Sequence, residues 1–172
     1  MKLLDLRKGD FPEYYQKYIE YLPDEDLIYI LRSQKEEMLD FLYSLRREDL
    51  SITYGEEKWT VAQVLQHTWD TERIFQYRAL CIARKDKTSF PGYDQDAYVP
   101  ASKAHERRLH GFIEEYAAIR DSSIALFRSF SQEMLDEKGT SNGLGLTAAA
   151  AGFIIAGHEK HHLKLFQSRY GL

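Results

Sequence analysis

Apolar residues recur at helical spacing in four long segments of the chain, at about residues 24–45, 60–84, 102–130 and 147–170. In the first segment they form one stripe, made of Leu27, Ile30, Leu31, Met38, Leu42 and Leu45. The second segment opens with Thr60 and Gln63, which have the spacing of a capping box. A shorter piece over residues 14–22 is expected to add a turn or two of helix. We therefore expect one all-α domain over residues 1–172, a four-helix bundle with no sheet of more than two short strands.

The connections between these segments are unequal in length. Residues 85–101 form a long link between the second and third helices, and its length suffices to return the chain along the whole bundle and set those two helices parallel. Long loops in compact domains are often functional. The aromatic residues Phe90, Tyr93 and Tyr98 predict that the link packs against the bundle.

Composition narrows the class of protein. The chain of 172 residues has 23 Lys and Arg against 27 Asp and Glu, a formal net charge of −4, and no basic run, which disfavours a wide nucleic-acid interface. Its single cysteine, Cys81, excludes an internal disulfide and any CxxC metal site. The N-terminus lacks the apolar stretch of a signal peptide, and the most apolar window, residues 146–157, is too short to span a bilayer. We expect a soluble, cytoplasmic protein.

Three of the six histidines are placed as metal ligands would be. His158 and His162 are four residues apart, hence on one helix face, and their seam includes apolar residues that point inward. His67 lies on the comparable seam of the second segment. Taken alone, His67 is typical of a core histidine, and the HxxxH pair arises often by chance. Together the three predict a site for zinc, nickel or another divalent ion with open coordination positions.

The other three histidines are not expected to bind this metal. His161 is one position off the seam, while His105 and His110 fall in a charged stretch, so we expect these three outside the site. Residues 158–162 also match the H-E-x-x-H pattern of zinc proteases. The ten residues after His162 contain no further His, Asp or Glu, and Ser168 occupies the place of a third histidine. A protease is therefore disfavoured.

Several stretches of the chain resemble the DinB/YfiT-like superfamily of metal-binding four-helix-bundle proteins. They are residues 58–67 (KWTVAQVLQH), 70–73 (DTER), 90–98 (FPGYDQDAY) and 156–162 (AGHEKHH), and with residues 27–45 they extend the resemblance over nearly the whole chain. The resemblance implies an up-down-down-up bundle and a metal triad of His67, His158 and His162. It also implies a choice of activities, since relatives include transferases that use bacillithiol, mycothiol or glutathione-like thiols, a mycothiol-dependent isomerase and proteins described as metal-dependent hydrolases.

A three-histidine metal site supports two kinds of chemistry. It can bind a low-molecular-weight thiol as thiolate, which attacks a small electrophile, or it can activate water for hydrolysis. We expect the metal-dependent thiol S-transferase first, the metal-dependent hydrolase as the alternative, and a non-catalytic metal- or ligand-binding bundle as a third possibility. In each case the partner is a small molecule. Relatives commonly pair, so we also expect a homodimer.

Weaker candidates surround the predicted site. Arg78, Arg120 and Tyr98 are candidates for holding an anionic thiol cofactor, each with a structural role as the alternative. Glu159 is a weak candidate for a general base. Asp70, one turn beyond His67, is expected to orient an imidazole. Three expectations remain. Glu72 caps the loop or pairs with Arg73 or a neighbouring helix, and Trp59 and Trp69 anchor the core or an interface. The long link borders the metal pocket through Tyr93 or Tyr98.

Overall fold

The computed structural model describes all residues, 1–172, and contains the four expected long helices. They are α2 (Leu27–Ser44), α3 (Val61–Ala83), α5 (Leu109–Arg128) and α7 (Ala148–Leu165). Shorter elements connect them: η1 (Leu3–Asp5), η2 (Glu13–Tyr15), α1 (Gln16–Ile19), η3 (Arg47–Ser51), β1 (Ser89–Phe90), α4 (Gln95–Ala101), η4 (Ala104–Glu106), α6 (Gln132–Asp136), β2 (Lys138–Ser141), β3 (Leu144–Thr147) and η5 (Phe166–Tyr170).

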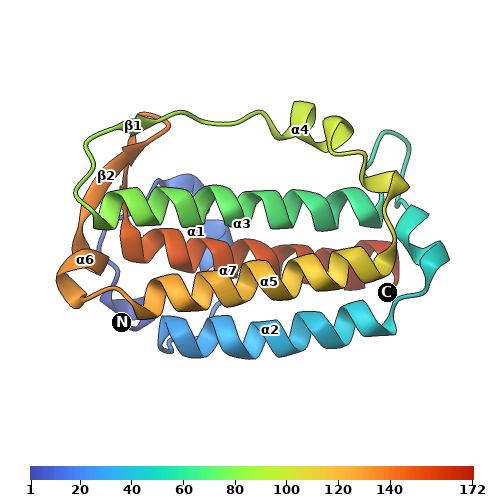
Figure 1. Cartoon of the computed structure of the whole chain (residues 1–172), viewed down its shortest axis with the longest axis horizontal. Helices are drawn as coiled ribbons and strands as arrows, with labels where there is room; N and C mark the ends of the chain where they lie inside the picture. The colour runs from blue at the N-terminus through green and yellow to red at the C-terminus, as the bar shows by residue number, and fades with distance from the viewer.

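The four long helices follow the expected up-down-down-up course. In Figure 1, α3 and α5 run in one direction while α2 and α7 run in the other. The chain leaves the end of α3, returns along the bundle through β1 and α4, and enters α5 at the opposite end. Helix α3 packs on α5 and α7, and α2 packs on the same two helices. The long link therefore makes α3 and α5 parallel neighbours, as its length predicts.

Side-chain caps define where several helices begin. The hydroxyl of Thr60 accepts a hydrogen bond from the backbone N–H of Gln63 (3.3 Å), and the Gln63 side chain accepts one from the N–H of Thr60 (2.8 Å). This is the predicted capping box, which satisfies two of the otherwise unpaired donors at a helix start. Asp26 and Thr147 cap α2 and α7 through their side-chain oxygens.

The third helix begins later than predicted. The sequence pattern indicates a start near residue 102, but α5 begins at Leu109, and residues 95–106 form α4, a turn and η4. Lys103 has φ of 52°, in the left-handed region, so the chain cannot continue a right-handed helix there. The apolar stripe starts at Leu109, and the polar residues before it have no buried face to stabilise a helix.

The prediction of at most two short strands was wrong. Strands β2 and β3 form an antiparallel hairpin, and β1 pairs parallel to β2 with Ser89 opposite Thr140, which makes a three-stranded sheet. The hairpin turns at Asn142 and Gly143, whose φ angles are 51° and 75°. Asn-Gly is favoured where both central residues of a turn need positive φ. The glycine-rich segment before α7 is thus a hairpin rather than a plain loop.

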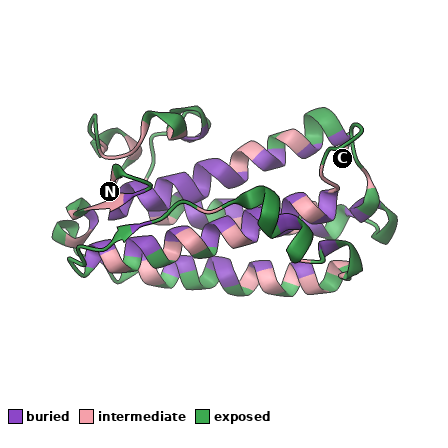
Figure 2. Ribbon diagram, turned by 90° about the horizontal axis from the view of Figure 1, so that it is seen from above, coloured by how far each residue is buried: buried purple, intermediate pink, exposed green.

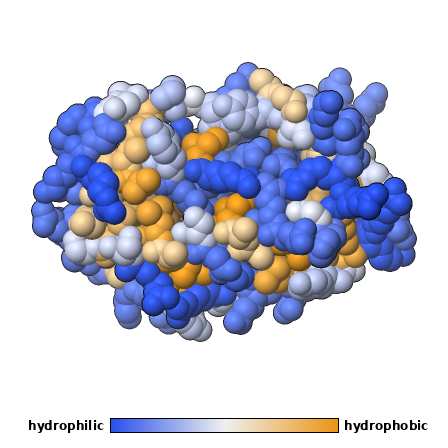
Figure 3. Space-filling view, viewed as in Figure 1, coloured by the Kyte–Doolittle hydropathy of each residue, from blue (hydrophilic) through white to orange (hydrophobic).

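The core extends along the bundle between the long helices. Helices α2, α3 and α5 present buried residues to their neighbours and exposed residues to solvent, whereas α7 is buried on nearly all sides (Figure 2). Helix α7 begins with four fully buried alanines, Ala148 to Ala151, which allow its neighbours to approach closely. The face shown in Figure 3 is mainly hydrophilic, with smaller hydrophobic areas, several of them toward the end of the molecule that carries α6 and β2. No helix combines the length and apolar character needed to span a membrane.

Candidate metal centre

Helices α3 and α7 bring the three predicted ligands together inside the bundle. His67 lies on α3, while His158 and His162 lie one turn apart on α7, and their exposed fractions are 5%, 6% and 8%. The Nε2 atom of His158 is 3.1 Å from the Nε2 atoms of both His67 and His162. One candidate ligand atom from each residue lies within 4.8 Å of the others. We call these three residues the histidine triad.

Burial keeps the triad neutral. It lowers the pKa of His67 to about 4. It also lowers the pKa values of His158 and His162 well below 6.5, with a further contribution from the neighbouring imidazoles. A neutral imidazole has a free lone pair on one ring nitrogen, which is the form that binds metals. The site therefore offers three neutral nitrogen donors.

The convergence of the three rings fits a divalent cation. His158 Nε2 cannot donate one proton to both neighbours at once, so hydrogen bonding alone leaves ring nitrogens facing each other. Zinc–imidazole bonds of about 2.05 Å at tetrahedral angles place ligand nitrogens about 3.3 Å apart, close to the 3.1 Å found here. Three nitrogen ligands also leave coordination positions open, as in catalytic sites.

Aromatic residues from other elements surround the triad. Tyr18 of α1 places its ring edge-on to His158, with centroids 5.4 Å apart, and the ring of Trp59 lies 5.0 Å from that of His67. The Thr71 hydroxyl donates to the His67 carbonyl at 2.7 Å and accepts from the Tyr93 hydroxyl at 2.6 Å. Tyr93 confirms that the long link borders the site. Apart from the aromatic residues clustered near it, nothing in the sequence indicates that Tyr18 belongs to the site. Trp59, which was expected only to anchor the core or an interface, also contacts the site through His67.

Glycine at position 157 explains how α1 reaches the site. A Cβ added to Gly157 lies 2.6 Å from the carbonyl oxygen of Tyr18 and 2.7 Å from its carbonyl carbon. Any side chain here displaces the α1 backbone, because atoms without a bond between them do not approach so closely. The missing side chain therefore permits Tyr18 to rest against His158.

The other three histidines lie outside the triad, as predicted. His161 is half-buried and packs against Tyr18 and Tyr21. His105 and His110 are exposed, and each lies beside a glutamate of its own segment.

Arg120 joins the two ligand-bearing helices in the core. Its guanidinium, with no exposed surface, donates to both carboxylate oxygens of Glu72 on α3 (2.9 Å each) and of Glu159 on α7 (3.1 and 2.7 Å). Ser123 donates to Glu72 at 2.5 Å. We call Arg120, Glu72 and Glu159 the Arg120 cluster. It confirms that Glu72 pairs with a neighbouring helix, and both Glu159 oxygens are engaged in this structural ion pair.

The remaining candidates, Arg78, Asp70 and Tyr98, lie on two different sides of α3. Arg78 is 4% exposed and donates to the Pro91 carbonyl at 2.7 Å. Asp70 accepts from Gln66 at 2.9 Å and makes no hydrogen bond to a histidine, so the expectation that it orients an imidazole was wrong. Asp70 and the half-exposed Tyr98 lie instead in a pocket of about 650 Å³ between α4 and the bundle.

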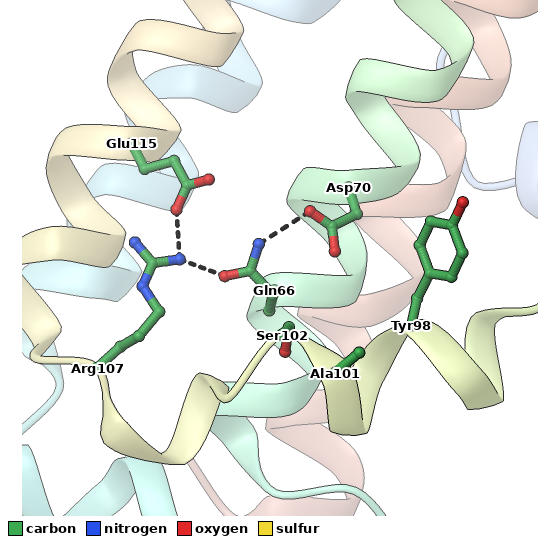
Figure 4. Close-up of a pocket in the computed structure, with 7 residues that line it drawn as sticks. All are labelled: Gln66, Asp70, Tyr98, Ala101, Ser102, Arg107 and Glu115. Carbon is green, nitrogen blue, oxygen red and sulfur yellow. Dashed lines mark hydrogen bonds and ion pairs between the residues drawn. The ribbon is translucent and has the colours of Figure 1, made fainter.

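Figure 4 shows how this pocket is arranged. Gln66 lies between Asp70 and Arg107, and Arg107 in turn contacts Glu115 of α5. The carboxylates on its wall are thus largely matched by protein donors. The pocket lies beside α3, which carries His67, but none of the three triad histidines lines it.

Comparisons with known proteins identify the family of the chain. Residues 14–166 match the model of the DinB superfamily. A protein of Oceanobacillus iheyensis named "Putative metal-dependent hydrolase OB0413" is 27% identical over 122 residues, which are 70% of this chain and 69% of that protein.

Two solved structures share the fold. YfiT from Bacillus subtilis, titled a probable metal-dependent hydrolase with an unusual four-helix-bundle topology, has a TM-score of 0.63 at 17% identity, covering 96% of this chain and 93% of its own. The mycothiol-dependent maleylpyruvate isomerase has a TM-score of 0.69 at 11% identity, covering 89% of this chain and 62% of its own. With a bundle of this topology and a family model matched along most of its length, the chain belongs to the DinB superfamily.

Proposed function

We propose that this protein is a divalent-metal-dependent hydrolase of small molecules, with the histidine triad as its metal ligands. The observation that carries the proposal is the convergence of three buried, neutral imidazoles with no carboxylate among them. The relatives named as metal-dependent hydrolases support it. When bound, a zinc or nickel ion supplies Lewis acidity, which polarises a substrate carbonyl or phosphoryl oxygen and lowers the pKa of water.

Residues around the triad shield it from water and fix the positions of the side chains and helices that form the site. Tyr18 and Trp59 limit the access of bulk water to the triad, since their rings lie against His158 and His67. The Tyr93 hydroxyl is fixed by Thr71, and Thr71 in turn is fixed by the His67 carbonyl. The Arg120 cluster holds α3 and α7 at constant separation from the side of α5. The nearby carboxylates of Glu72 and Glu159 are engaged with Arg120, so we assign them no proton transfer.

The test combines metal analysis with a substrate panel. We expect one divalent ion per chain in protein purified without added metal, and hydrolysis of esters, lactones or phosphoesters that stops on chelation and returns on adding the ion. His162→Ala should lose both metal and activity, whereas the neighbouring control His161→Ala should keep both. Bound metal without hydrolysis across the panel would contradict the hydrolase and favour a binding protein.

A second candidate function uses the same ligands. We propose as the alternative a metal-dependent transfer of a low-molecular-weight thiol to small electrophiles, because Lys17 lies close to His158 and Arg78 lies three turns from His67 on α3, and both cations suit an anionic thiol cofactor. Adding bacillithiol, mycothiol or glutathione to cobalt-loaded protein should then produce a thiolate-to-cobalt absorption band. The absence of that band with every thiol would eliminate this alternative.

A further inference from the structure

Arg78 is a buried cation without an acidic partner. Its side chain is on α3, the residue is 4% exposed, and no carboxylate lies within the 4.0 Å that defines an ion pair. Its one hydrogen bond runs from Nη2 to the carbonyl of Pro91. The phenols of Tyr15 and Tyr93 and the face of Phe75, 5.0 Å from the guanidinium carbon, make up its surroundings.

Arg78 lacks the carboxylate partners that the other buried arginine, Arg120, has. Arg120 is buried on the neighbouring helix and is held by two carboxylates. Buried charges are normally paired, because an unpaired charge loses its hydration without compensation. Burial accordingly lowers the pKa of Arg78, and no carboxylate opposes that effect. Its Nε and Nη1 atoms have no protein acceptor and are not fully sealed from solvent, although the residue as a whole is buried.

Arg78 lies on the same face of α3 as the triad. Eleven residues separate it from His67, which is three turns plus about 20° of rotation. Those three turns rise about 16 Å, and helical side chains lean toward the N-terminus, so an extended arginine covers about 6 Å of that distance. Tyr93 lies between the two positions, with its hydroxyl on Thr71. The guanidinium is therefore directed along α3 toward His67. The His67 imidazole leans the same way by about 3 Å, so about 13 Å separates the two side-chain ends, of which a hydrogen bond to the guanidinium takes about 3 Å.

The N-terminal segment packs against this face at both of its ends. Tyr15 of η2 packs edge-on against Phe75 near Arg78, with ring centroids 5.6 Å apart, and Tyr18 of α1 packs against His158. The Lys17 amine sits over the rings of Tyr14 and Tyr18 and adds a second positive charge close to His158. On the other flank of α3, the negative charge of Asp70 contributes to raising the pKa of Tyr93, and the Asp70 carboxylate accepts a hydrogen bond from Gln66. The face between Arg78 and the triad is thus aromatic and positively charged.

We infer that Arg78 is the binding group for an oxyanion, a carboxylate or phosphate, at the far end of a small substrate whose reacting group reaches the triad. This inference rests on the proposed function for the role of the triad. It assigns the substrate class: an elongated anionic molecule with about 10 Å between its charged end and the group that reacts.

The subsite can be tested without metal. Calorimetric titration of metal-free protein with succinate and with inorganic phosphate should show millimolar binding of one or both, and the one that binds identifies the oxyanion. Arg78→Met should weaken that binding about tenfold or more, since charge-assisted hydrogen bonds are the strong ones. Arg78→Lys, which keeps the charge and guards against misfolding, should fall between wild type and Arg78→Met. The control Arg73→Met, an exposed arginine paired with Glu115, should bind like wild type.

A second titration tests whether the subsite serves the triad. Straight-chain hydroxamic acids that end in a carboxylate are compared with their methyl esters on cobalt-loaded protein. The acids should bind about tenfold more tightly than the esters in wild type and equally in Arg78→Met. Failure of both compounds while succinate still binds would refute the metal proposal and leave the subsite standing. No binding of succinate or phosphate, or binding that survives in Arg78→Met, would overturn the subsite.

Discussion

Gly157→Ala probes the contact on which the shape of the site depends. The added Cβ meets the Tyr18 carbonyl oxygen at 2.6 Å, whereas ordinary contacts begin at about 3.4 Å, so the α1 backbone must move by about 0.8 Å. Overpacking of a buried position costs about 1–3 kcal/mol, and here the obstacle is backbone, so we take the upper end. Alanine returns about 1 kcal/mol of helix propensity. We expect a net loss of about 2 kcal/mol in the free energy of unfolding.

Urea denaturation of the metal-free protein measures this loss, with Gly111→Ala as the matched control. Gly111 is also helical, but its added Cβ meets only the Arg107 side chain at 3.7 Å, so alanine should stabilise the protein by about 0.5 kcal/mol. Since Tyr18 retreats from His158 in Gly157→Ala, cobalt-loaded samples should also differ in absorption and in metal affinity. Equal stability of the two variants, with unchanged metal affinity, would refute the reasoning.

Four further outcomes are expected. Alanine at any one position of the histidine triad should lower metal affinity by orders of magnitude while the circular-dichroism spectrum stays helical; loss of metal from His161→Ala instead would mean that the helix register is wrong. Arg120→Met should lower the free energy of unfolding by about 3–5 kcal/mol, because it leaves two buried carboxylates unpaired, and a change under 1 kcal/mol in urea would contradict this. The metal-free protein should lose stability as pH falls below 6.5: unfolded imidazoles take up protons there, whereas folded His67 stays neutral to about pH 4. Glu159, whose pKa burial raises to about 7, opposes this change, but the three imidazoles of the triad outnumber it, so the denaturation midpoint should fall between pH 7.5 and 5.5; a midpoint that does not move would exclude the reasoning. Light scattering should give twice the mass of one chain if the protein is a homodimer, and the mass of a single chain at micromolar concentration would reject the dimer.

The long helices and the His158–His162 pair were predictable because both depend on local spacing, whereas His67 was added from its place on the inward seam of another helix and from the family resemblance. An apolar stripe specifies which helix face turns inward, and His158 and His162 share such a face. The Asn-Gly pair at residues 142–143 is an equally local signal, because it favours the positive φ angles of a two-residue hairpin turn. The short flanking strands have too few residues to show a clear alternation, so the pair is the main indication of the hairpin.

The rest of the site depends on contacts between distant parts of the chain. Tyr18 reaches His158 only because Gly157 lacks a side chain, and nothing near Tyr18 in the sequence indicates this. Likewise Asp70 and Glu72 are equally plausible partners by type, but only the packing of α3 on α5 directs Glu72 to Arg120. Asp70 and Glu72 therefore differ in role because their side chains leave α3 in different directions, not because of their residue type.

The position of the triad in the chain has a consequence for folding. His67 and His158 are separated by 91 positions, and the chain has a single cysteine, so no disulfide closes this loop. An ion held by both helices acts as a removable cross-link that does so. Unlike a disulfide, the ion is released when the chain unfolds, so it stabilises the folded state by mass action, by about 4.1 kcal/mol when the free ion is at 1,000 times its dissociation constant. Metal supply would then set what fraction of the chain is folded, as well as whether its site is complete.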